Sequence, residues 1–229
     1  MTDGSDDRQS PAGSAEDPHA DQHVVTAGAP IRAAEVAVVL LHGRGATAQG
    51  VVNLAEPLYR HGVAFFAPQA ARSRWYPHSF LAPVERNEPH LSSALCAVDA
   101  VVDDAVAKGI PLDRVVLFGF SQGACLAAEY AARNPRRYGG VAALSGGLVG
   151  PLDARRVYDG SLSGTPAFFG CGDADDHVPV ERVRETAAAF RDLNAEVTER
   201  IYPGLEHAVN DDEMAFVGSL VERLAGSPE

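Results

Sequence analysis

The 229-residue sequence lacks any run of about 18 consecutive apolar residues, the length that a membrane-spanning helix requires. Its N-terminus is acidic and polar, so it also lacks the basic and apolar regions of a secretory signal peptide. Only three cysteines occur, Cys96, Cys125 and Cys171, far apart and in apolar surroundings. That spacing excludes a disulfide framework and a zinc site and predicts three small buried side chains. We therefore expect a cytoplasmic protein with no integral membrane association.

Positive charge is scarce as well. Lys108 is the only lysine, and the formal net charge is −12. A protein with this charge repels phosphate backbones and anionic lipid surfaces, so nucleic acid is not an expected partner. Nothing in the composition requires an assembly beyond a monomer or homodimer.

The chain divides into a short tail and one domain. Residues 1–22 contain six acidic side chains among Ser, Gly, Pro and Ala, with no apolar periodicity, which predicts a disordered acidic tail. Residues 23–229 are long enough for a single domain with a full core. In them, apolar runs of strand length alternate with helical patterns, which predicts an α/β fold with a mostly parallel sheet and helices on both faces.

The expected strands lie at 23–26 (a weak edge strand), 36–41, 63–67, 114–118, 140–144, 167–171 and 196–202. The expected helices cover 47–60, 91–107, about 122–133, 180–193 and 211–224. Binding sites in such sheets lie beyond the carboxyl ends of the strands. The polar candidates His42, Ser121, the acids at 173–176 and His207 each follow a predicted strand.

The most informative stretch is Gly119-Phe120-Ser121-Gln122-Gly123, between an apolar strand and a helix of small residues. Gly-x-Ser-x-Gly in this position is the nucleophile-elbow pattern, in which a sharp strand-to-helix turn exposes the serine. The glycines leave room for that turn, and the new helix directs free N–H groups at the space above Ser121. An ordinary tight turn is the alternative reading, and the flanking elements favour a nucleophile.

A serine nucleophile needs a base and an acid that orients the base. After Ser121 the sequence has only His177 and His207, and His207 lies in the loop that follows the last predicted strand, where the base is expected. The acid follows the strand ending at Cys171, where three aspartates crowd one loop. Spacing alone leaves all three open: Asp173, Asp175 and Asp176.

Acyl transfer also requires backbone N–H groups directed at the oxyanion. Gln122, directly after the nucleophile, is expected to supply one. The second is expected from Arg44, through its backbone N–H, because His42-Gly43-Arg44-Gly45 lets the chain approach closely.

Taken together, four motifs resemble those of the phospholipase/carboxylesterase branch of the α/β-hydrolases, which includes acyl-protein thioesterases and small esterases. They are Leu41-His42-Gly43-Arg44-Gly45, Gly119-Phe120-Ser121-Gln122-Gly123, Asp173-Ala174-Asp175-Asp176-His177-Val178-Pro179 and Gly204-Leu205-Glu206-His207. The resemblance covers about residues 36–224 and implies an α/β-hydrolase fold. It implies that the second aspartate of the third motif, Asp175, completes the triad, although Asp176 stands where the family commonly has proline.

The same resemblance narrows the class of substrate that we expect. Arg44 resembles the Gly-Arg-Gly form of the small esterases and replaces the apolar residue usual in acyl-protein thioesterases. The segment Trp75-Tyr76-Pro77 also resembles the small esterases, where it lines the pocket, so Trp75, Tyr76, Phe80 and Leu81 are expected to bind substrate. Core packing of Trp75 is the alternative.

The sequence therefore predicts a serine hydrolase of small or medium-sized carboxylic esters, with Ser121, His207 and Asp175 as the triad and Gln122 and Arg44 at the oxyanion. No metal or organic cofactor is implied. A thioesterase or lysophospholipase is the alternative among enzymes. A non-catalytic ligand-binding relative is the alternative outside them.

Overall fold

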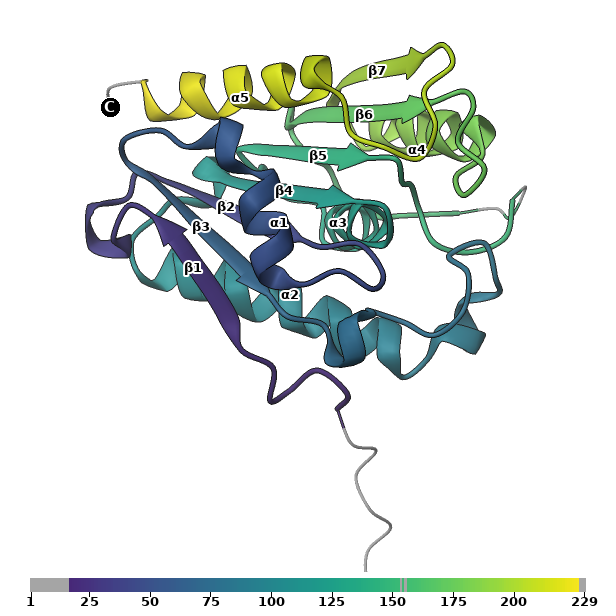
Figure 1. Cartoon of the computed structure of the whole chain (residues 1–229), viewed down its shortest axis with the longest axis horizontal. Coiled ribbons are helices and arrows are strands. Elements are labelled where there is room, and N and C mark those ends of the chain that lie inside the picture. Colours follow the sequence, from purple (N-terminus) through teal and green to yellow (C-terminus); the bar gives the residue numbers. More distant parts are fainter. Residues whose placement is uncertain (1–16, 153, 155, 227–229) are drawn as a thin grey trace, which may run out of the picture.

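The computed structural model describes residues 17–152, 154 and 156–226. Seven strands form one sheet in the order β1-β3-β2-β4-β5-β6-β7 (Figure 1). Only β1 runs antiparallel to its neighbour, β3, and all other neighbouring pairs are parallel. This is the predicted mostly parallel sheet, with the weak first strand at its edge.

The strands are β1 (Val24–Gly28), β2 (Val36–Leu41), β3 (Val63–Pro68), β4 (Val115–Phe120), β5 (Gly140–Leu144), β6 (Pro166–Gly172) and β7 (Glu196–Tyr202). The α-helices are α1 (Ala48–Leu54), α2 (His90–Ala107), α3 (Gln122–Arg133), α4 (Val180–Asp192) and α5 (Asp211–Ala225). Short 3-10 helices lie at Ile31–Ala33, Glu56–Leu58, Ala71–Ser73, Val84–Asn87 and Leu112–Arg114.

The helices cover both faces of the sheet because the central strands are apolar on both sides. In β2 the side chains of Val36, Val38 and Leu40 pack into a core layer shared with α1 and α5. The alternate side chains of the same strand pack into the other layer, shared with α2, α3 and α4. All six residues of β2 are fully buried, as a continuous apolar run predicts.

The helix predicted over residues 47–60 is shorter than expected. Thr47 caps α1 by accepting a hydrogen bond from the Gly50 N–H, and the helix ends at Leu54. A separate 3-10 turn, Glu56–Leu58, follows, with Pro57 in its first turn. Proline has no N–H to donate, so it cannot continue the helix and instead begins the new turn.

Part of the predicted tail is packed against the domain. Residues 1–16 lie outside the described part of the chain, but residues 17–22 form a turn in which His19 is only 3% exposed. The His19 ring accepts a hydrogen bond from the Ala71 N–H through Nδ1 and donates one from Nε2 to the Trp75 carbonyl. The domain therefore begins earlier than residue 23.

The prediction that all three cysteines are buried is wrong for Cys96. Cys125 and Cys171 are buried, but Cys96 is exposed on α2. The buried positions of this helix include Leu91, Ala94 and Val98, a helical spacing that leaves position 96 on the opposite face. Within the described residues, no helix is long and apolar enough to cross a membrane.

Candidate active site

The four loops that carry the predicted motifs meet at one edge of the sheet. Strands β2, β4, β6 and β7 are parallel, so their carboxyl ends point the same way. His42 follows β2, Ser121 follows β4, Asp175 follows β6 and His207 follows β7. The sheet thus brings together residues that lie far apart in the sequence.

Ser121 is held in a turn that only small neighbours permit. Its backbone has φ 56° and ψ −123°, outside the regions that most residues adopt. A Cβ atom on Gly123 would lie 2.0 Å from the Leu41 carbonyl oxygen, and one on Gly119 would lie 2.3 Å from the Gly123 backbone. Both glycines of the elbow are therefore required by close backbone contacts.

Three side chains form a continuous hydrogen-bonded line. The Ser121 hydroxyl lies 2.8 Å from His207 Nε2, and His207 Nδ1 lies 2.7 Å from Asp175 Oδ2. The Asp175 side chain is fully buried, whereas that of His207 is 18% exposed. The buried end of the line is thus a carboxylate and the accessible end is a hydroxyl.

Asp175 is ionised, and this fixes the protons along the line. Burial alone would raise its pKa, but hydrogen bonds from His207 and from the N–H groups of His177 and Val178 outweigh burial and hold the pKa below its ordinary value. An ionised carboxylate only accepts, so the proton of the imidazole sits on Nδ1. The lone pair of Nε2 therefore faces the Ser121 hydroxyl.

The other two aspartates of the loop have different surroundings. Asp173 Oδ1 accepts a hydrogen bond from the Gly204 N–H, which ties the loop after β6 to the loop after β7. The Asp176 side chain is 85% exposed and pairs with His177 Nδ1 at 2.6 Å. Of the three candidates that the sequence left open, only Asp175 contacts His207.

The His207 ring is held from both sides. Its centroid lies 5.0 Å from that of Phe120 and 4.6 Å from that of His177, with interplanar angles of 30° and 27°. These contacts keep the imidazole in the plane that joins Ser121 and Asp175. The same cluster, Asp175, His177 and His207, brings three metal-ligating atoms within 4.8 Å of one another, and the hydrogen-bonded line already explains two of them.

The two expected oxyanion donors lie at the start of α3 and in the loop after β2. Gln122 is the first residue of α3, so its backbone N–H has no partner within the helix. In the other loop the Gly45 N–H donates to the Ser73 carbonyl and the Ala46 N–H to that of Gly43. Along the chain, the Arg44 N–H lies between Gly43, which packs on Ser121, and the N–H groups of Gly45 and Ala46, which already have acceptors.

The side chains of Gln122, Trp75 and His42 hold the oxyanion loop in place, a role that the sequence analysis did not predict for them. The Gln122 amide accepts a hydrogen bond from the Trp75 N–H and donates one to the Tyr76 carbonyl. The Trp75 indole donates to the His42 carbonyl at 2.9 Å, and the buried His42 ring accepts from the Ala70 N–H. Segment 70–76 is thus bonded to the Gln122 side chain and to His42, which begins the loop that carries Arg44.

The Arg44 side chain binds backbone carbonyl oxygens of a neighbouring segment. Its guanidinium donates to the carbonyl oxygens of Tyr76, Pro77 and His78. A guanidinium presents several donors in one plane, so a single side chain fixes three successive carbonyls. Arg44 thereby holds the segment that forms one wall of the site.

A cavity of about 320 Å³ opens above Ser121. Of the four residues expected to bind substrate, Tyr76 and Phe80 line this cavity, and Trp75 and Leu81 do not. Trp75 is fully buried, and its indole N–H donates to the His42 carbonyl. It therefore supports the oxyanion loop instead of facing the substrate. The remaining lining residues are Arg44, Ser79, Ser121, Gln122, Cys125, His177, Val178 and His207.

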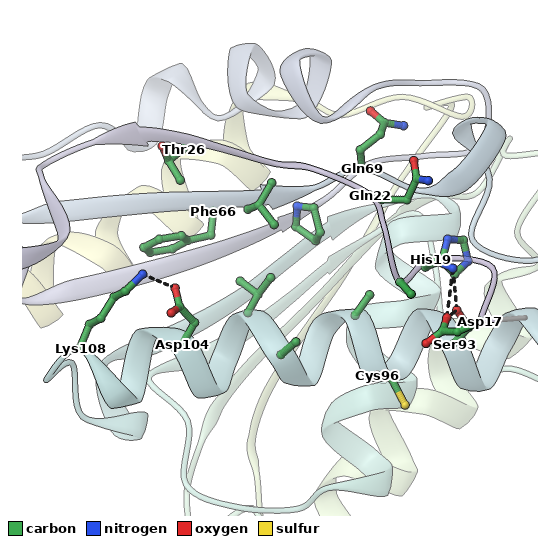
Figure 2. Close-up of a pocket in the computed structure, with 16 residues that line it drawn as sticks. Asp17, His19, Gln22, Thr26, Phe66, Gln69, Ser93, Cys96, Asp104 and Lys108 are labelled. Carbon is green, nitrogen blue, oxygen red and sulfur yellow. Dashed lines mark hydrogen bonds and ion pairs between the residues drawn. The ribbon is translucent and has the colours of Figure 1, made fainter.

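A second, larger cavity of about 540 Å³ lies between α2 and the face of β1 and β3 (Figure 2). Figure 2 shows Asp17, His19 and Ser93 at one end and the Lys108–Asp104 ion pair at the other. Its floor is apolar, with Phe66 among the residues that line it. Its lining includes neither Ser121 nor His207, so the cavity above Ser121 is the candidate active site.

Glu213 is a buried acid close to the loop that carries His207. It forms a capping box with Asn210: each side chain accepts a hydrogen bond from the backbone N–H of the other residue. The residue is fully buried, and its Oε1, which faces Gly170, has no hydrogen-bond partner among the described residues. Burial raises the pKa of Glu213 to about 7.

Replacement of Glu213 with glutamine is expected to stabilise the protein at high pH. Between pH 4.5 and 7 the unfolded state loses this proton and the folded state keeps it, so the contribution of Glu213 to stability falls as the pH rises and reaches its minimum above 7. Glutamine retains the capping box without the charge. The Gln variant should gain on the order of 2–3 kcal/mol over wild type at pH 8 and almost nothing near pH 4.5, measured by urea unfolding.

The matched control is Glu222→Gln, an exposed acid on the same helix with a 69% exposed side chain. It removes only a surface ion pair with Arg60, so its effect on the free energy of unfolding should stay below about 1 kcal/mol at both pH values. A pH-independent effect of Glu213→Gln would contradict the expectation.

Comparison with known proteins identifies relatives over nearly the whole domain. The phospholipase/carboxylesterase family model matches residues 21–224. Acyl-protein thioesterase 1 of Saccharomyces cerevisiae is 27% identical over an alignment of 221 positions, gaps included, that covers 87% of this chain and 97% of that protein. Lysophospholipase-like protein 1 of Mus musculus is 32% identical over an alignment of 148 positions that covers 61% of each chain.

Among solved structures, a phospholipase/carboxylesterase from Dyadobacter fermentans has a TM-score of 0.83 and 44% sequence identity. The match covers 87% of this chain and 96% of that one. The carboxylesterase of Bacillus cereus shares the fold, with a TM-score of 0.72 at 19% identity.

Proposed function

The chain belongs to the phospholipase/carboxylesterase family of α/β-hydrolases, and we propose that within this family it is a carboxylesterase for small or medium-sized esters. The family makes the protein a serine hydrolase of the esterase or thioesterase type. The observation that carries the proposal is the line from the Ser121 hydroxyl through His207 to Asp175, with separations of 2.8 and 2.7 Å. A binding module has no use for a base placed against a serine in this way.

In the proposed acylation step, the Ser121 hydroxyl attacks the ester carbonyl carbon while His207 Nε2 takes the hydroxyl proton. The carbonyl π electrons move onto oxygen, and the oxyanion accepts hydrogen bonds from the backbone N–H groups of Gln122 and Arg44. As the oxyanion collapses, the bond to the alcohol oxygen breaks, and His207 gives its proton to that oxygen. Asp175 keeps its charge throughout and stabilises the imidazolium.

Deacylation repeats these steps with water. Water attacks the acyl-enzyme carbonyl and loses its proton to His207, and the Ser121 oxygen leaves with that proton. The products are a carboxylic acid, an alcohol and the free enzyme. The step needs access to water, and the exposed side of the His207 ring provides it.

The size of the proposed substrate follows from the cavity. Its volume of about 320 Å³ is at the small end of ligand pockets. The Arg44 side chain binds the carbonyl oxygens of residues 76–78, which form one wall of the cavity. These bonds hold that wall in place and so limit widening of the cavity. We therefore expect compact acyl groups to be preferred over long ones.

The test is hydrolysis of p-nitrophenyl esters with acyl chains from two to sixteen carbons (a chosen range that spans small to large ligands). We expect kcat/KM to peak at short chains. A peak at long chains would favour the lysophospholipase alternative. Thioesters matched in chain length test the thioesterase alternative, which a higher kcat/KM than for the oxygen esters would support.

A further inference from the structure

Tyr76 lines the active-site cavity, and its side-chain hydroxyl has no assigned role. The Tyr76 side chain is 1% exposed, yet its hydroxyl forms no hydrogen bond with the residues that the structure describes. Buried polar atoms almost always have a partner, because an unpaired one costs about 1–3 kcal/mol. Burial raises the pKa of Tyr76 well above its ordinary value, so the hydroxyl keeps its proton and remains a donor.

The Cys125 thiol lies near this hydroxyl and is a weak partner for it. Cys125 lines the same cavity one helical turn after Ser121, and its sulfur accepts a hydrogen bond from the Gly147 N–H at 3.5 Å. Burial raises the pKa of the Cys125 thiol to about 11, so it stays a neutral thiol. A thiol is a poor hydrogen-bond partner, so it does not satisfy the Tyr76 hydroxyl.

The mechanism decides which part of a substrate meets Tyr76. His207 must give its proton to the leaving alcohol, so the alcohol lies beside His207 and the exposed ring of His177. The Gln122 amide binds the Tyr76 carbonyl, so Tyr76 lies on the side of the oxyanion donors. Because the alcohol occupies the part of the cavity beside His207 and His177, the part lined by Tyr76, Phe80 and Cys125 is left for the acyl group.

We propose that the preferred acyl group carries an oxygen, a hydroxyl or a keto group, that accepts a hydrogen bond from the Tyr76 hydroxyl. This inference rests on the proposed function, since it assigns the acyl side of an ester. An unsubstituted acyl chain leaves the Tyr76 hydroxyl unpaired, whereas an oxygen-substituted one pairs it. A net hydrogen bond of this kind raises kcat/KM on the order of 10-fold.

The experiment compares pairs of p-nitrophenyl esters that differ by one oxygen. They are butanoate with 2-hydroxybutanoate and with 3-hydroxybutanoate, and pentanoate with 4-oxopentanoate. Electronegative substituents activate esters, so each kcat/KM is divided by the rate constant for hydrolysis by hydroxide. The readout is the corrected ratio within a pair, from which a loss of activity common to both esters cancels.

In wild type, at least one oxygen-substituted ester should exceed its parent by about 10-fold, and Tyr76→Phe should bring that ratio close to one. Tyr59→Phe, at a tyrosine that does not line the cavity, is the matched control and should keep the wild-type ratio. A wild-type ratio near one in every pair overturns the inference. An unchanged ratio in Tyr76→Phe does so as well, because it gives Tyr76 a structural role only.

These outcomes are separate from failure of the proposed function. If wild type and Ser121→Ala hydrolyse every ester at the same rate, the esterase assignment fails and the acyl preference fails with it. If wild type hydrolyses the parents in a Ser121-dependent way without preferring oxygen, only the acyl preference fails.

Discussion

Ser121→Ala is expected to lower kcat for ester hydrolysis by on the order of 10⁴-fold or more, because it removes the hydroxyl oxygen that lies against His207 Nε2. Residual hydrolysis would come from the oxyanion donors and from binding, which the substitution leaves in place. The measurement is release of p-nitrophenol from a short-chain ester, with wild type and variant side by side.

Two controls separate chemistry from folding in this experiment. Ser219→Ala removes an exposed hydroxyl on α5 that bonds only the Ala215 carbonyl, and it should retain full activity. Alanine tolerates the backbone of residue 121 about as well as serine, so the thermal midpoint of Ser121→Ala should stay close to wild type. A fluorophosphonate probe should label wild type and leave Ser121→Ala unlabelled. Equal labelling of both proteins would contradict the assignment of the nucleophile.

Asp175→Asn should lower kcat by on the order of 10⁴-fold, while Asp176→Asn should change it by less than about twofold. An amide at position 175 offers an N–H to His207 Nδ1, which then accepts and leaves its proton on Nε2. That tautomer cannot take the Ser121 proton. The side chain at position 176 is 85% exposed and pairs with His177, so solvent and salt screen its charge from the reacting atoms.

This pair of variants tests the choice among adjacent acids directly. Steady-state kinetics should show a fall in kcat with little change in KM for Asp175→Asn, because the orientation of the base matters in the transition state and not in substrate binding. Equal losses in the two variants would indicate a general effect of loop charge. A larger loss in Asp176→Asn would move the triad to the neighbouring residue.

The sequence predicted the order of strands and helices, because continuous apolar runs and helical periodicity are local signals. Spacing alone could not choose among Asp173, Asp175 and Asp176, and only the family resemblance pointed to Asp175, because the choice depends on contacts with another loop. Asp173 binds the Gly204 N–H, Asp175 binds His207, and both partners lie about thirty residues further along the chain. Only the register of β6 beside β7 brings those loops together.

Trp75 and Cys96 show two further kinds of missed information. The partner of the Trp75 indole is a carbonyl 33 residues away, so no local pattern marks this side chain as buried support. Cys96 is different, because the spacing of apolar residues in its own helix already placed it on the exposed face. Burial of Trp75 can be recognised only once the fold is known, whereas exposure of Cys96 follows from the helical spacing of its neighbours.

The buried His19 has a practical consequence for where the protein should be trimmed. Family similarity begins at residue 21, and a truncated protein that starts there would look complete by that criterion. It would nevertheless leave the Trp75 carbonyl and the Ala71 N–H without the imidazole that pairs with both. Trp75, in the segment that His19 binds, also contacts Gln122 and His42. A shortened protein that keeps the active site intact should therefore begin upstream of the residue at which family similarity begins.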